Sequence, residues 1–323
     1  FFFQILIAGS SDPVFGENGM IVSTSKQASE VGIEILKKGG NAVDAAVAVG
    51  FALAVTSSSN GNIGGGGFMV AAMTDGETFT LDYREKAPAA AHRDLFLNDS
   101  GNVVPGMSLF SRAGSGVPGT VDGLIRALAD HGSGNITLRQ ALAPAIRLAE
   151  KGFELSHYEA RRFNGYEGLF QSNDAAAAIF IRKDNNPWKK GDKLVQRDLA
   201  KTLKRISKYG RDGFYTGPVA DLIVAEMKRG NGLISLEDLK NYLSVYRDHV
   251  SGTYNGHEVI SMGPPSSGGA LLVNMMNMLE NYPVDSLGWN SSDYIHLLTE
   301  VERRAYADRA EHMGDSDFWD VPV

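Results

Sequence analysis

The stretch GNIGGGGFMVAAMTDGETFTLDYREKAP, residues 61–88, joins a glycine run to two apolar runs and a charged end. Asp75-Gly76 separates the apolar run 68–73 from Thr78–Tyr83, and this dipeptide between two strand-like runs predicts a β-hairpin. The second strand continues into Asp82-Tyr83-Arg84-Glu85. The stretch therefore predicts a loop without side chains that leads into a hairpin with a charged cluster at its end.

The four consecutive glycines Gly64–Gly67 have two interpretations. Glycine allows a close approach of other backbone at no steric cost, but it loses the most entropy on folding. The run is therefore either a tight helix-to-strand corner under another layer, or the wall of an active site formed by Gly64, Gly65 and Gly66. A phosphate loop is disfavoured, because no Gly-Lys-Ser/Thr follows and the expected order is helix, loop, strand.

Composition excludes several classes of site and partner. The chain has 323 residues, of which 43% are hydrophobic, so a substantial core is available. A net charge of −7 argues against nucleic acid or an anionic membrane as the main partner. Cysteine is absent, and the seven histidines are scattered without an HExxH pattern, so no metal site is expected. No other cofactor is expected either. No apolar run is long enough to span a membrane.

The pattern of apolar residues favours a layered α/β protein with a mainly helical middle at about 120–250. The helix expected over 42–55 is apolar almost all round and must be buried on every side; its single charge, Asp44, is expected near the helix start. The whole chain, 1–323, is expected to form a single domain. Other predicted helices are 26–38, 121–131, 138–151, 156–163, 196–209, 217–229, 235–242, 270–279 and 291–313, and further strands are 19–23 and 256–262. The apolar residues Phe1–Gly9 are either a first strand or the remnant of a signal peptide.

Three polar features are candidate functional groups. Arg84 would present a planar fork suited to a carboxylate, unless it forms a structural salt bridge with Asp82 or Glu85. Ser266 and Ser267 either face a ligand or belong to a loop that only turns a strand into a helix. The charged face of the last helix is either solvated or an interface with a partner chain. No G-x-S-x-G elbow or Ser/His/Asp set can be assembled, so the chain offers binding groups rather than a nucleophile.

Six motifs together carry a resemblance to a known family, in the family order and over residues 19–323. They are Gly39-Gly40-Asn41-Ala42-Val43-Asp44-Ala45-Ala46, Gly61-Asn62-Ile63-Gly64-Gly65-Gly66-Gly67-Phe68, Leu81-Asp82-Tyr83-Arg84-Glu85-Lys86-Ala87-Pro88, Gly116-Val117-Pro118-Gly119-Thr120-Val121, Pro264-Pro265-Ser266-Ser267-Gly268-Gly269, and Ala305-Tyr306-Ala307-Asp308-Arg309 with Gly314-Asp315. With these motifs the chain resembles the large subunit of the γ-glutamyltranspeptidases (glutathione hydrolases).

The resemblance implies a fold and a mechanism. The fold is expected to be the αββα sandwich of N-terminal-nucleophile hydrolases, of which this chain supplies the large-subunit part. Family members are made as a precursor that cleaves itself, and the small subunit then begins with the nucleophilic threonine, whose α-amine is the general base. No catalytic residue is therefore expected in this chain. The small subunit is also expected to hold the oxyanion with two backbone amides.

The resemblance also implies site residues, partners and a location. Arg84 is expected to bind the substrate α-carboxylate, and Gly64, Gly65, Gly66, Glu85, Ser266 and Ser267 are expected in the pocket wall. The expected partners are the small subunit as a heterodimer, glutathione or another γ-glutamyl substrate, and an amino acid or dipeptide acceptor. The expected location is the bacterial periplasm or the exterior. The alternatives are a cephalosporin (glutaryl) acylase-like enzyme, a capsule γ-glutamyl enzyme, or a non-catalytic binding homologue.

Overall fold

A computed structural model describes residues 13–323, which form two compact units. The first unit contains residues 13–60 and Gly132–Ala200, and the second contains Gly61–His131 and Lys201–Val323. The two interpretations of Phe1–Gly9 lie outside the described residues. The expectation of a single domain stays a prediction.

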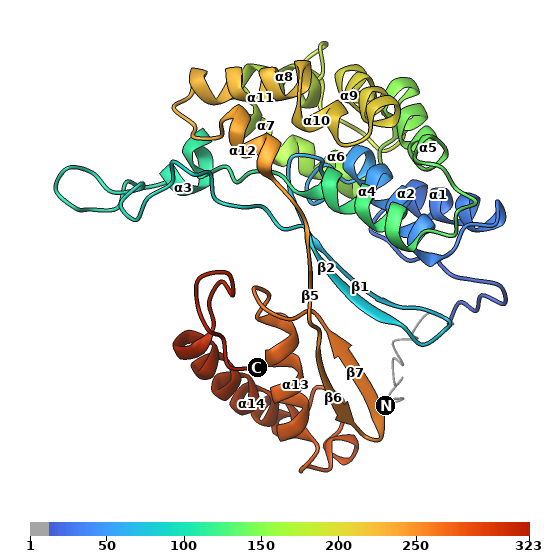
Figure 1. Cartoon of the computed structure of the whole chain (residues 1–323), viewed down its shortest axis with the longest axis vertical. Helices are drawn as coiled ribbons and strands as arrows, with labels where there is room; N and C mark the ends of the chain where they lie inside the picture. Colours follow the sequence, from blue (N-terminus) through green and yellow to red (C-terminus); the bar gives the residue numbers. More distant parts are fainter. Residues whose placement is uncertain (1–12) are drawn as a thin grey trace, which may run out of the picture. The chain divides into compact units, whose positions relative to one another are not determined.

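The first unit is built on three helices. Helix α1 (Lys26–Lys37) packs on α2 (Ala42–Thr56), which in turn packs on α5 (Leu138–Lys151); Figure 1 shows α1 and α2 in blue and α5 in green. Most apolar side chains between Val43 and Val55 are buried, but Ala46 is exposed and Leu53 is half-buried, so the helix expected over 42–55 is largely buried rather than buried on every side. The unit also contains β3 (Phe153–Glu154), α6 (His157–Gly165), α7 (Glu167–Gln171), α8 (Asp174–Phe180) and β4 (Lys193–Leu194), and α9 (Arg197–Tyr209) begins in it.

Asp44 lies at the start of α2, as expected, and it is fully buried. One of its carboxylate oxygens, Oδ2, accepts the backbone N–H of Asn41 at 2.8 Å and that of Ser133 at 3.0 Å. The backbone N–H of Asp44 donates to Asn41 Oδ1 at 2.9 Å, which completes a capping box. The carboxylate therefore pairs with the N-cap amide of α2 and with the loop amide of Ser133.

We expect Asp44→Ala to lower the free energy of unfolding by roughly 1–3 kcal/mol, because two part-buried amides, those of Asn41 and Ser133, lose their acceptor. Urea unfolding followed by circular dichroism measures the change. Glu30→Ala is the control, because within the described part of the chain the exposed Glu30 of α1 makes only a surface ion pair with Lys26, worth about 1 kcal/mol or less. Equal losses in the two variants would contradict this role of Asp44.

The second unit contains a three-stranded antiparallel sheet of order β1-β2-β5. Strands β1 (Phe68–Ala72) and β2 (Thr78–Asp82) form the predicted hairpin, in register from Phe68 opposite Asp82 to Ala72 opposite Thr78. Gly76 in the turn has φ 89°, a conformation that favours glycine. Strand β5 (Val245–Arg247) pairs with the other edge of β2, with Asp82 opposite Val245 and Thr80 opposite Arg247.

A second hairpin and two helices complete this unit. Strands β6 (Val250–Tyr254) and β7 (His257–Ser261) pair with each other, and helix α13 (Gly268–Leu279) packs on both strands and on α14 (Ser292–His312), as Figure 1 shows. The remaining elements are α3 (Met107–Phe110), η1 (Arg112–Gly114), α4 (Thr120–His131), α10 (Asp212–Tyr215), α11 (Pro218–Arg229), α12 (Leu236–Asn241) and η2 (Val284–Ser286).

The long predicted helices are confirmed to within about two residues at each end, but two parts of the prediction were wrong. The predicted strand 19–23 is not formed, since none of the described strands pairs with it. The short helices α3, α7, α8 and α10 were not predicted, because four to seven residues are too few for a helical period to stand out.

Candidate functional site

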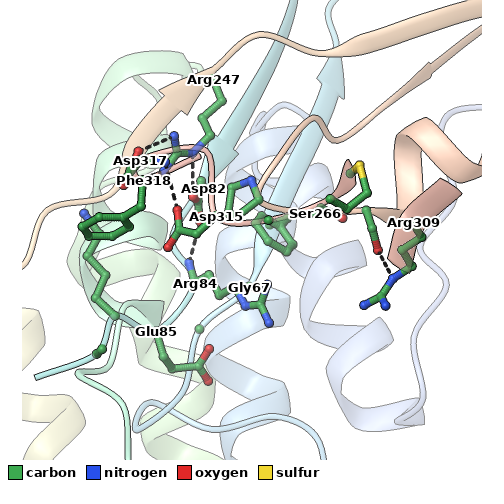
Figure 2. A pocket seen from close by; sticks show the side chains of 18 residues that line it. Gly67, Asp82, Arg84, Glu85, Arg247, Ser266, Arg309, Asp315, Asp317 and Phe318 are labelled. Atoms are coloured by element: carbon green, nitrogen blue, oxygen red, sulfur yellow. Dashed lines mark hydrogen bonds and ion pairs between the residues drawn. The ribbon is translucent and has the colours of Figure 1, made fainter. Parts of the chain in front are cut away.

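A cavity of about 980 Å³ lies within the second unit, at the charged end of the β1–β2 hairpin (Figure 2). Its wall is made of short segments that are far apart in the sequence. These are 66–68, Asp82, 84–87, Arg247, 265–267, Arg309, 313–315, Asp317 and Phe318. The cavity is large enough for a small peptide-like ligand.

The structure brings most of the expected site residues together at this cavity. Gly66, Arg84, Glu85, Ser266 and Ser267 all line it. The other two expected residues are not among the described residues that line it: Gly64 is exposed elsewhere on the loop, and Gly65 is buried. The carbonyl oxygen of Gly65 accepts the N–H groups of Gly119 at 2.7 Å and of Thr120 at 3.0 Å, so this glycine faces the neighbouring loop.

Glycines from two loops make room for the backbone that carries Arg84. A Cβ on Gly66 would lie 2.5 Å from the carbonyl oxygen of Tyr83 and 2.7 Å from the amide nitrogen of Glu85. A Cβ on Gly119 would lie 2.1 Å from the same Tyr83 oxygen. The glycine run therefore forms a tight corner that packs against other backbone, and at Gly66 it also lines the cavity. Both interpretations of the run, a tight corner and the wall of a site, apply to it.

Arg84 is exposed, and its guanidinium forms no ion pair within residues 13–323. The alternative of a structural salt bridge with Asp82 or Glu85 is therefore not seen. Asp82 contacts Arg84 only through the backbone, where its Oδ1 accepts the Arg84 N–H at 2.9 Å. An unpaired guanidinium in a cavity wall is free to bind a carboxylate ligand through two parallel hydrogen bonds.

Arg247 of β5 pairs with Asp82 instead, and the sequence did not identify it. Its Nε donates to Asp82 Oδ2 at 2.7 Å, while Nη1 and Nη2 donate to the two oxygens of Asp317 at 2.8 and 3.1 Å (Figure 2). The side chains of Arg247 and Asp82 are 13% and 6% exposed, so the pair is well shielded from water. No motif marks Arg247 in the sequence, because only the pairing of β5 with β2 brings it to Asp82.

Ser266 and Ser267 both have local partners. The Ser266 hydroxyl oxygen accepts the N–H of Gly268 at 3.3 Å, near the start of α13. The hydroxyl of Ser267 accepts a hydrogen bond from Nε of Arg309 at 3.0 Å. The two serines therefore form the strand-to-helix turn and also line the cavity, so neither interpretation excludes the other. Whether they contact substrate stays a prediction.

The ion pair with Arg247 lowers the pH at which the Asp317 carboxylate takes up a proton. Hydrogen bonds from Arg247 hold the pKa of Asp317 below its ordinary value, against the opposing effect of burial. A lowered folded-state pKa means that the pair stabilises the fold above the unfolded pKa of about 3.9, and that this stability is lost as pH falls through the folded value.

We therefore expect the Asp317 carboxyl carbon to titrate below pH 3.9 in an NMR pH titration. Arg247→Met should raise the midpoint, because the charged donors that hold the pKa of Asp317 down are removed. A midpoint at or above the ordinary value in the unmodified protein would contradict the ion pair.

Comparison with known proteins identifies the family. The sequence profile of the γ-glutamyltranspeptidases matches residues 28–323. The chain belongs to this family. It is 46% identical over 310 residues to the glutathione hydrolase proenzyme of Escherichia coli K12, an alignment that covers 96% of this chain and 53% of that protein. The chain thus spans about half the length of the curated γ-glutamyltranspeptidase relative.

A solved structure confirms the predicted fold class. The γ-glutamyltranspeptidase of Helicobacter pylori is similar with a TM-score of 0.93 and 44% identity, covering 96% of this chain and 88% of that chain. The family resemblance predicted from the motifs is therefore confirmed, together with the N-terminal-nucleophile hydrolase fold of mixed helices and strands. The acylase ACY 1 proenzyme of a Pseudomonas species is 36% identical, over 96% of this chain and 56% of that protein.

Proposed function

We propose that this chain is the large-subunit part of a γ-glutamyltranspeptidase. The enzyme cleaves the γ-glutamyl amide bond of glutathione and related compounds, and it transfers the γ-glutamyl group to water or to an amino acid or dipeptide. The observation that carries the proposal is the unpaired guanidinium of Arg84 in the wall of the cavity. The substrate α-carboxylate matches this group in charge and in its planar, two-pronged shape.

The nucleophile is proposed to come from a partner. A threonine at the start of the small subunit attacks the amide carbonyl carbon, its α-amine takes the hydroxyl proton, and the amine of the leaving group departs protonated. Water or the acceptor amine then resolves the γ-glutamyl ester. The relatives' description as proenzymes supports a precursor that is cut into two chains. In this scheme the large-subunit residues Arg84, Gly66, Glu85, Ser266 and Ser267 bind and orient substrate and perform no covalent step.

The acylase relative supports a second candidate, a glutaryl acylase. A glutaryl group keeps a carboxylate at the position of the γ-glutamyl α-carboxylate but lacks the α-ammonium group. Arg84 would serve either substrate, so the choice depends on the ammonium. Glu85 and Asp315, which line the cavity together with the cationic Lys86 and Arg309, offer this ammonium group an anionic partner.

A location in the bacterial periplasm or outside the cell is also proposed, on the strength of the family relationship. Within the described part of the chain, no helix is both long enough and apolar enough to cross a bilayer. In residues 13–323 there is also no group of three or more His, Asp or Glu side chains that could hold a metal ion.

The test compares γ-glutamyl anilide with glutaryl anilide as substrates for the purified full-length precursor. The proposal expects cleavage into two chains, the smaller beginning with threonine by mass spectrometry, and release of aniline from the γ-glutamyl compound. Preference for the glutaryl compound would favour the acylase. A precursor that matures and cleaves neither compound, or one that never matures, would favour the non-catalytic homologue.

A further inference from the structure

Side chains form hydrogen bonds to the backbone N–H and to the backbone carbonyl oxygen of Arg84. Both of these contacts involve residues of one segment, 242–247, either directly or through Asp82. The N–H of Arg84 donates to Asp82 Oδ1 at 2.9 Å, and the other oxygen of Asp82 accepts Nε of Arg247 at 2.7 Å. Its carbonyl oxygen accepts the phenol O–H of Tyr242 at 2.8 Å. Within residues 13–323 the guanidinium itself forms no ion pair, and Arg84 lines the cavity.

Close packing around the Tyr242 side chain fixes the position of its phenol group. Tyr242 is 3% exposed, and its ring lies parallel to that of Tyr215 with the centroids 5.8 Å apart. A Cβ on Gly119 would lie 2.0 Å from the phenol oxygen, so only glycine at position 119 leaves room for the phenol. Burial raises the pKa of Tyr242 above its ordinary value, so the phenol stays protonated and can donate at neutral pH.

The segment is itself held by a part-buried ion pair between Arg211 and Asp122. Arg211 Nε donates to Asp122 Oδ1 at 2.7 Å, and its Nη2 donates to the carbonyl oxygen of Tyr242. Asp122 Oδ2 accepts the backbone N–H of Ser244 at 2.8 Å, and the Asp122 side chain is only 7% exposed. The backbone of Tyr242 and of Ser244 is therefore anchored by two side chains that are paired with each other.

We infer that Tyr242 and Arg247 are positioning residues for substrate, which act through the backbone of Arg84 and fix where its guanidinium meets the substrate carboxylate. The inference rests on the proposed function. A side chain on a long flexible stem binds a carboxylate best when its backbone is preorganised, since less freedom is then lost on binding. Neither residue needs to contact the substrate for this role.

The test uses Tyr242→Phe, which removes the hydroxyl and keeps the ring that stacks on Tyr215. The readout is carboxylate selectivity: kcat/KM for γ-glutamyl anilide divided by kcat/KM for its α-carboxamide analogue, measured on the mature two-chain enzyme. The analogue keeps the ammonium group and loses only the negative charge. A loss of stability alone lowers both rates equally and leaves this ratio unchanged.

We expect Tyr242→Phe to lower the ratio roughly three- to tenfold, the range that one lost hydrogen bond supports, mainly through KM. Tyr246→Phe is the matched control: Tyr246 lies in the same segment and donates to Asp130 at 2.9 Å, away from Arg84, so the ratio should not change. Arg247→Met should lower the ratio and Arg247→Lys should restore part of it, because a lysine can still pair with Asp82.

The inference is overturned if the unmutated enzyme cleaves the anilide and prefers the compound with the carboxylate, but Tyr242→Phe leaves the ratio unchanged. Failure of the proposed function looks different: the unmutated enzyme would then cleave neither compound, or would show no preference between them. If Arg247→Met does not fold, Tyr242→Phe still decides the question.

Discussion

Arg84→Ala is expected to raise KM for γ-glutamyl substrates by roughly 10- to 150-fold, which corresponds to a loss of about 1.5–3 kcal/mol for a charge-assisted pair. The reason is the position of the guanidinium: it lines the cavity and forms no ion pair within the described chain. A carboxylate ligand would be its first ionic partner, and alanine offers none.

The measurement is steady-state hydrolysis of γ-glutamyl anilide by the mature enzyme. Cleavage of the precursor should survive in the variant, since Arg84 has no part in the proposed covalent chemistry. Arg303→Ala is the control, because Arg303 is exposed on α14 and pairs only with Glu300 there. A KM that stays within twofold of the unmutated value in Arg84→Ala would contradict the assignment.

Among the possible Gly→Ala substitutions in the glycine run, Gly66→Ala is expected to reduce stability and substrate binding the most. Its Cβ would lie 2.5 Å from the Tyr83 carbonyl oxygen and 2.8 Å from the Arg84 carbonyl carbon, and backbone atoms cannot turn aside as a side chain can. Overpacking of this kind costs about 1–3 kcal/mol, occasionally more. We expect a lower midpoint of thermal unfolding and a raised KM, because the displaced backbone carries Arg84.

Gly64→Ala is the matched control on the same loop. Its Cβ would meet nothing closer than Asn62 Oδ1 at 3.7 Å, an ordinary contact. The two variants add the same methyl group two residues apart, so differences in solubility or loop entropy largely cancel. Equal tolerance of both would show that the loop and the Tyr83–Glu85 backbone are not packed as described.

The sequence predicted those features that local chemistry decides. Asp75-Gly76 between two apolar runs gave the hairpin, because few dipeptides fit that turn. Asp44 was predicted at a helix start, because a lone carboxylate in an apolar helix is stable only where unpaired amides can meet it. Arg84 was singled out by its place at the end of a strand.

Features that depend on tertiary pairing could not be predicted in this way. Arg247 meets Asp82 only because β5 joins the edge of β2, across a long stretch of intervening chain. Tyr242 reaches the Arg84 carbonyl for the same reason. Within the glycine run, Gly64 and Gly66 are identical in sequence terms, and only the fold decides that Gly66 lies against backbone while Gly64 lies in the open.

The most direct test of the central claim is a crystal structure of the mature two-chain enzyme with glutamate, the product of γ-glutamyl hydrolysis, in the cavity. We predict both oxygens of its α-carboxylate within about 3 Å of the Arg84 guanidinium nitrogens, in a paired arrangement. Glutamate bound with its α-carboxylate on another cation, and with Arg84 facing solvent, would contradict the account.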